Sequence, residues 1–231
     1  MEKQNTDTAF VEAYSQNDKT EDRLIHPAIF RFLGDPKGLQ IIDYGCGEGE
    51  LAFKMASMGA EVTGLDVDPA MVESARSRFD HPSISFEQVY DNKMPLEDDS
   101  IDAIVSNLVL MMIPSLDGVR KVVEESHRIL KSGGRLVFTV TNPAFVDKDF
   151  SVYRNIFDDS FRYGEVGQAY QFVLKTEDGR EITHPTFRDY HYKWDDYINA
   201  VAHSGLRIAE VKEILIPDNH YPPYVVFCAS K

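Results

Sequence analysis

Hydrophobic and polar positions follow two alternating rhythms between residues 39 and 141 of this 231-residue chain. Short runs rich in β-branched residues predict strands at residues 39–43, 61–66, 83–89, 101–107 and 135–141. Longer amphipathic stretches between them predict helices at residues 48–58, 69–79 and 116–130. Asp68-Pro69 is a typical helix start, and Lys131-Ser132-Gly133-Gly134 is a typical helix stop. Strands that alternate with helices of this length predict a mostly parallel sheet joined by right-handed crossovers.

The pattern changes after Thr141. Residues 142–168 are irregular and rich in aromatic side chains. Glu177-Asp178-Gly179 then predicts a hairpin turn between strands at residues 170–176 and 180–187. A helix at residues 195–203, ending at Gly205, and two strands near residues 206–216 and 224–229 complete the expected secondary structure.

These elements predict a single domain, residues 1–231, with four parts. We expect an N-terminal helical lid at residues 1–38, a ligand-binding core at 39–143, a substrate cap at 144–192, and the last helix and strands at 193–231. The cap is expected at the carboxyl ends of the parallel strands, because it follows the fifth strand, and ligands bind at that edge of such sheets.

Charge and composition narrow the function. The chain carries 38 acidic and 24 basic residues, a formal net charge of −14, and no basic cluster. Nucleic acid and anionic membranes are therefore not expected as partners. No signal peptide is evident, and no apolar run approaches the ~18 residues of a membrane helix. The two cysteines, Cys46 and Cys228, predict a cytoplasmic protein with reduced thiols.

A glycine-rich turn follows the first predicted strand. Gly45, Gly47 and Gly49 come directly after Asp43 and precede a helix. Glycines at this place let the chain turn sharply and leave room for a ligand. The third glycine comes one residue earlier than in the dinucleotide-binding fingerprint, so the turn suits a ligand that has no phosphate to cradle.

Asp66 ends the second predicted strand, 21 residues after Gly45 (66 − 45 = 21). An acidic residue at this distance can bind both hydroxyls of a ribose. The alternative role of a strand-end aspartate is a helix cap, but Asp68 already fills that role before Pro69. The ribose role is therefore favoured.

The motif Asp43-x-Gly45-x-Gly47-x-Gly49, with Asp66 after the next strand, resembles the class I, Rossmann-like S-adenosylmethionine-dependent methyltransferases. The resemblance continues through residues 91–103 and 130–136, and the C-terminal part is similar to a subgroup that acts on small molecules. It implies a doubly wound α/β fold with a seven-stranded, mostly parallel sheet whose last strand is antiparallel. It also implies S-adenosyl-L-methionine as cofactor and methyl transfer to an O, N or C atom by in-line displacement.

The resemblance further implies a set of cofactor-binding residues along the core. They are Gly45 and Gly47 at the methionine part with Asp43 supporting their turn, Asp66 at the ribose, Val67 and Met71 at the adenine ring, Asp91 and Asn92 near the adenine amino group, and Asn107 at the cofactor's amino group through its backbone. Tyr14 is expected to close over the methionine end, with an ordinary core or surface tyrosine as the open alternative.

Catalysis of this kind requires mainly alignment of the acceptor and exclusion of water, because a sulfonium methyl is already electrophilic. His191 is the best candidate for a general base, and a structural histidine is the alternative. No metal site is expected, since His184 and His191 lack ligand spacing. Asn107-Leu108-Val109-Leu110 lacks the proline pair common in methylases of planar amino groups, which favours a small-molecule acceptor.

Two other functions stay open. One is a non-catalytic module that binds S-adenosylmethionine, since a fold does not fix a function. The other is an NAD(P)-dependent oxidoreductase, which fits Asp66 but not the glycine spacing. The sequence identifies neither the acceptor molecule nor the oligomeric state, for which we expect a monomer or a homodimer.

Overall fold

A computed structural model describes residues 11–13, 20–90, 93–217 and 219–231 of the chain. Its main sheet contains seven strands in the order β10-β11-β5-β4-β1-β2-β3. β11 runs antiparallel to both of its neighbours, whereas the other pairings in the sheet are parallel, so the predicted fold is confirmed. The strands are β1 (Gln40–Tyr44), β2 (Glu61–Asp66), β3 (Ile84–Gln88), β4 (Ile101–Asn107), β5 (Leu130–Thr141), β10 (Arg207–Ile214) and β11 (Tyr224–Ser230).

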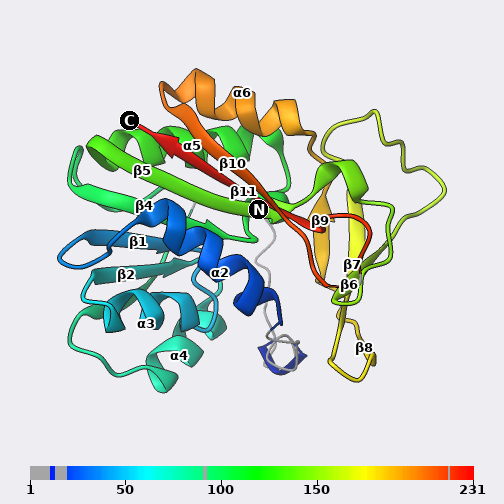
Figure 1. Cartoon of the computed structure of the whole chain (residues 1–231), viewed down its shortest axis with the longest axis horizontal. Helices are drawn as coiled ribbons and strands as arrows, with labels where there is room; N and C mark the ends of the chain where they lie inside the picture. Colours follow the sequence, from blue (N-terminus) through cyan, green and yellow to red (C-terminus); the bar gives the residue numbers. More distant parts are fainter. Residues whose placement is uncertain (1–10, 14–19, 91–92, 218) are drawn as a thin grey trace.

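Helices cover both faces of this sheet (Figure 1). One face packs against α2 (Thr20–Leu33), α3 (Glu50–Ser57) and α4 (Pro69–Arg78), and the other against α5 (Leu116–Ile129) and α6 (Trp194–Ser204). α5 shows why such helices dock: its buried positions Val119, Val122, Val123, Ser126 and Ile129 recur every three or four residues and form one apolar stripe. The result is a three-layer α/β domain with a core on each side of the sheet.

Local signals in the sequence set several of these boundaries. Asp68 Oδ1 accepts a hydrogen bond of 2.9 Å from the Ala70 N–H, and Gly205 ends α6 at φ 95°, both as predicted. The predicted helix stop at residues 131–134 is wrong. α5 ends at Ile129, because Leu130 is already extended and pairs with Ile101 as the first residue of β5. Gly133, at φ +81°, thus lies within that strand.

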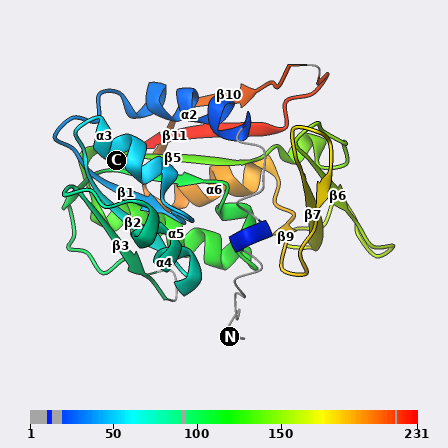
Figure 2. The ribbon, with the colours of Figure 1, turned by 90° about the horizontal axis from the view of Figure 1, so that it is seen from below.

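A second, antiparallel sheet follows the end of β5. It contains β6 (Tyr153–Ile156), β7 (Ala169–Lys175), β8 (Glu181–Ile182) and β9 (Arg188–Tyr190). The predicted hairpin is present as β7 and β8, although the strand expected at residues 180–187 is shorter and a separate strand, β9, pairs with β7. The Tyr170 side chain bonds to Thr141 and so ties this sheet to the end of β5. Figure 2 shows it lying beyond the main sheet, to the right.

The strands β1, β2 and β4 all end at one edge of the main sheet, because they run parallel. Their connections to the following helices leave from this carboxyl edge, and β5 ends at the same side as β4. This edge is therefore where a ligand would meet several loops at once. None of the helices in the described part of the chain combines the length and apolar character needed to cross a membrane.

Candidate functional site

The glycine turn after β1 is held by packing at two of its three glycines. Gly45 has φ +76°, and a Cβ added there would lie 2.2 Å from Cγ2 of Val109. Gly49 has φ +86°, and an added Cβ would lie 2.7 Å from the ring of Phe86. Both positions therefore require glycine for two reasons: the backbone is left-handed, and a neighbouring side chain approaches too closely for a Cβ.

Gly47 differs from the other two because it faces open space. Its φ is +52°, and no atom lies within 4 Å of the position that a Cβ would take. Its N–H donates a hydrogen bond of 2.9 Å to Oδ2 of Asp66, while Oδ1 of Asp66 accepts one of 2.9 Å from the Asp68 N–H. The fold thus brings the turn and the end of β2 together, with open space beside Gly47.

Two carboxylates make this part of the protein strongly acidic. Asp43 is 2% exposed, and burial, with a contribution from the negative charge of Asp66, raises its pKa to about 7. Burial also raises the pKa of Asp66 to about 6, although the N–H groups of Asp68 and Gly47 oppose the shift. Asp43 Oδ2 has no hydrogen-bond partner among the described residues. A ligand that brings hydroxyl donors or positive charge would stabilise the ionised carboxylates.

The end of β4 contributes polar and strained residues to the same edge. Asn107 ends the strand, and its Oδ1 is buried without a partner in the described chain. Leu108 follows with φ +59°, an uncommon conformation for leucine, and its N–H donates to the Thr139 carbonyl at 3.0 Å. This backbone places Val109 against Gly45. Leucine carries no sequence signal for a left-handed conformation, so sequence reasoning missed this feature.

The remaining predicted cofactor residues are placed unequally. Val67 is 52% exposed beside Asp66 and offers an apolar side chain to a ligand. Met71 lies in α4, is 4% exposed and packs into the core, so most of its side chain serves the fold. Tyr14, Asp91 and Asn92 lie outside the residues that the structure describes, and their predicted roles stay predictions.

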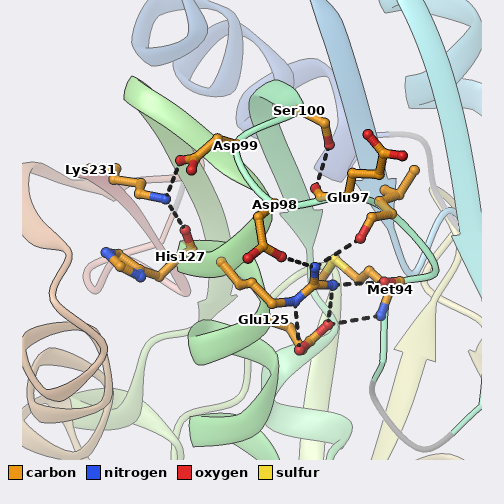
Figure 3. Close-up of polar contacts among 10 residues, drawn as sticks. Met94, Glu97, Asp98, Asp99, Ser100, Glu125, His127 and Lys231 are labelled. Atoms are coloured by element: carbon orange, nitrogen blue, oxygen red, sulfur yellow. Dashed lines mark hydrogen bonds and ion pairs between the residues drawn. The ribbon is translucent and has the colours of Figure 1, made fainter.

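The connection from β3 to β4 is anchored by an arginine of α5, a feature that sequence reasoning did not single out. Figure 3 labels three of its partners, Met94, Asp98 and Glu125. The Arg128 guanidinium donates to the carbonyls of Leu96 and Met94, at 2.8 and 3.0 Å, and pairs with Asp98 and Glu125. An open pocket of about 470 Å³ lies between this anchor and the end of β3. The anchor fixes the chain that follows the predicted adenine-contacting segment.

His191 lies next to the second sheet rather than in open space. It is 1% exposed, and its Nε2 lies 2.8 Å from the Tyr163 carbonyl, where it is placed to donate a hydrogen bond. Its ring packs against Phe161 and Tyr163, and burial lowers its pKa. With Nε2 engaged, only Nδ1 is left to accept a proton. The base role stays a prediction, and the observed contacts are those of the structural alternative.

Comparison with known sequences identifies the domain that carries this site. Residues 42–138 match the sequence profile of a methyltransferase domain, a range that contains the glycine turn, Asp66 and Asn107. The chain therefore contains a methyltransferase domain, and its fold is that of the S-adenosylmethionine-dependent methyltransferases. Its cofactor is S-adenosyl-L-methionine, and the protein is an enzyme of this class.

Individual relatives of this methyltransferase show how far the similarity extends. It is 28% identical to an N-demethylindolmycin N-methyltransferase of Streptomyces griseus, over 94% of the chain and 92% of that protein. It is 34% identical to a ubiquinone/menaquinone biosynthesis C-methyltransferase of Desulfotalea psychrophila, over 48% of the chain and 44% of that protein. A crystal structure of an S-adenosylmethionine-dependent methyltransferase from Mesorhizobium loti shares the fold, with a TM-score of 0.70 at 24% identity, over 89% of this chain and 96% of that one.

Proposed function

We propose that this methyltransferase acts on a small molecule. The observation that carries the proposal is the match to the N-demethylindolmycin N-methyltransferase, because it extends over 94% of the chain. That match therefore includes the second sheet, which lies outside the residues 42–138 of the family profile. The absence of a basic cluster and the net charge of −14 also argue against a nucleic-acid acceptor.

The described residues suit S-adenosylmethionine in three respects. Gly47 faces a space that any side chain at this position would fill, and Asp66 stands beside that space. Asp43 Oδ2 is a buried polar atom that lacks a partner among the described residues. Two acidic groups with raised pKa values are suited to a ligand that carries positive charge and ribose hydroxyls.

In the proposed site, the backbone at Gly45 and Gly47 faces the methionine part, and Asp43 supports their turn. Asp66 binds the ribose hydroxyls, and Val67 covers the adenine ring. When bound, S-adenosylmethionine supplies an electrophilic methyl group on a positively charged sulfur. The chain's own contribution is to align the acceptor with the bond that breaks and to exclude water.

The second sheet is the proposed cap over the acceptor. It follows β5 directly and is tied to the end of that strand by the contact between Tyr170 and Thr141. Its aromatic side chains, such as Phe157 and Phe161, already pack against one another, and a pocket needs only a few apolar walls. Buried, free Cys46 and Cys228 support the further proposal of a cytoplasmic location.

Calorimetric titration and a turnover screen test this proposal. The purified protein is titrated with S-adenosylmethionine, S-adenosylhomocysteine and NAD, and only the first two are expected to bind. It is then incubated with S-adenosylmethionine and a panel of small amines, phenols and quinols, including N-demethylindolmycin, and products are detected by mass spectrometry. Binding without any turnover would favour the non-catalytic module, and binding of NAD alone would favour the oxidoreductase.

A further inference from the structure

Two polar side chains stand next to each other, unpaired, at the carboxyl edge of the sheet. Asn107 of β4 and Thr139 of β5 are partners in the parallel register. Thr139 is fully buried, and its Oγ1 has no hydrogen-bond partner in the described chain; the same holds for Oδ1 of Asn107. Two neighbouring buried atoms therefore lack partners at the same place on the sheet.

These side chains share the face on which the cofactor site is built. Asp43 of β1 pairs with Val105, and Asn107 is two residues further along β4, so both point to the same side of the sheet. Thr139 lies on this side as well, because it is in register with Asn107. Val137 and Val226, its neighbours on β5 and β11, are buried and apolar. The polar residues next to Thr139 on this face are Asn107 and Thr141, and Thr141 already bonds to Tyr170 of the second sheet.

The unpaired hydroxyl destabilises the free protein. A buried donor or acceptor without a partner carries its full desolvation penalty, and valine would fill the same space in a strand at no such cost. Both polar atoms would be satisfied by a group that enters from outside the chain. Asn107 Oδ1 can only accept, so that group must bring at least one N–H or O–H donor.

The order of the strands indicates which ligand this is. Asp66 and Val67, proposed for the ribose and adenine, lie at β2, and the turn proposed for the methionine part follows β1. β4 and β5 lie on the opposite side of β1 from β2, and the second sheet follows β5. A ligand that lies beyond the methionine part, on the side of β4 and β5, would be the methyl acceptor.

We propose that the side chains of Asn107 and Thr139 bind the reacting group of the acceptor, and that this group is an amine or hydroxyl. The inference rests on the proposed small-molecule function and specifies its substrate class. In the transfer, the acceptor's nitrogen or oxygen forms a bond to the methyl carbon while the carbon–sulfur bond breaks. The bonding pair stays on sulfur, which becomes a neutral thioether, and the acceptor's proton leaves to solvent.

Thr139→Val tests the role of the hydroxyl with little change of shape. The variant should unfold at the same or a higher temperature than wild type, because it loses an unpaired buried hydroxyl. Its affinity for S-adenosylhomocysteine should stay within about twofold, while kcat/KM for the acceptor found in the screen should fall about 5- to 30-fold, the effect of one lost hydrogen bond. Thr139→Ser keeps the hydroxyl and should retain most of the turnover.

Ser106 provides the matched control. It is 1% exposed, its Oγ also has no partner among the described residues, and it precedes Asn107 on the opposite face of β4. Ser106→Ala should therefore resemble Thr139→Val in stability but leave kcat/KM unchanged. Unchanged turnover in Thr139→Val would overturn the proposal, as would a tenfold loss of S-adenosylhomocysteine affinity, which would place the hydroxyl at the cofactor.

The nature of the product gives a second, independent check. An N- or O-methylated product agrees with the proposal, whereas methylation at a carbon atom of a quinol would overturn it and leave the small-molecule function intact. A wild-type protein that binds S-adenosylhomocysteine but methylates nothing in the panel would instead remove the proposed function, and this inference with it.

Discussion

Replacing Asp66 by asparagine is the sharpest test of the cofactor site, because the structure shows what each oxygen of this side chain does. Oδ2 accepts from the Gly47 N–H and Oδ1 from the Asp68 N–H, both at 2.9 Å. Asparagine keeps the shape but loses the charge, and its NH₂ group must face one of these two donors. We expect the loss of charge-assisted bonds to the ribose to cost about 1.5–3 kcal/mol, or about 10- to 150-fold in Kd.

The same substitution should change the stability of the free protein little. The folded pKa of Asp66, about 6, lies above its ordinary value of 3.8, so the ionised carboxylate is disfavoured by folding above that pH. Asparagine removes this cost and one hydrogen bond together, and the two effects oppose each other. A variant that unfolds near the wild-type temperature but binds weakly would therefore report on the ligand and not on the fold.

The assay is calorimetric titration with S-adenosylhomocysteine at about pH 8, where Asp66 is ionised. Asp68→Ala is the matched control, two residues away. It removes the cap of α4 and should cost about 1 kcal/mol of stability without changing the affinity by more than about twofold. Wild-type affinity in a folded Asp66→Asn protein would refute the ribose assignment, and so would an equal loss in both variants.

The remaining predictions concern the turn, the pH response and the histidine. Gly47→Ala should weaken S-adenosylhomocysteine binding at least about tenfold. Gly38→Ala is the control, because it introduces the same left-handed strain of about 1–2 kcal/mol in equally open space, and it should leave the affinity unchanged. Equal affinities of the two variants would show that the turn has only a structural role. Affinity measured by calorimetry should fall as the pH drops below about 6, because Asp66 becomes protonated, and an unchanged affinity at lower pH would contradict this. The folded pKa of Asp43, about 7, lies above its ordinary value of 3.8, so the free protein becomes less stable as the pH rises through 7. Asp43→Asn should therefore raise the melting temperature more at high pH than at low pH. An equal rise at both pH values would exclude this titration. His191→Ala should lower the stability of the protein, whereas His191→Gln should keep both the hydrogen bond to the Tyr163 carbonyl and the activity. If His191 is instead a general base, both variants should turn over about 10²–10⁴-fold more slowly.

The proposed cofactor half of the site could be predicted from the sequence because its residues are close together in the chain. Gly45, Gly47 and Asp66 belong to one βαβ unit, in which a parallel pairing brings the end of one strand beside the end of the next. The number of residues between the turn and Asp66 therefore predicts that the two lie close together in the fold. The hydrogen bond from Gly47 to Asp66 is the direct result, and no knowledge of the rest of the fold was needed to expect the two residues together.

Boundaries were predicted less well where two local signals competed. Lys131-Ser132-Gly133-Gly134 has the composition of a helix stop, yet α5 ends before it, at Ile129. Leu130 pairs with Ile101, and Lys231 donates to the His127 carbonyl and pairs with Asp99, which fixes the end of the helix from outside (Figure 3). Tertiary contacts therefore set the end of α5, whereas the composition alone predicts that the glycines end the helix.

The proposed acceptor half could not be predicted in the same way, because its residues are distant in the sequence and carry no motif. A threonine in a buried strand such as β5 is ordinary by propensity, and nothing in the sequence distinguishes Thr139 from Thr141. The difference arises only when the sheet is assembled: Thr141 meets Tyr170 of the second sheet, while Thr139 is left beside Asn107 without a partner. An unsatisfied polar atom is a property of the fold and not of the chain. The search for an acceptor should therefore begin from such atoms, and His191, which the sequence favoured, already has its partner.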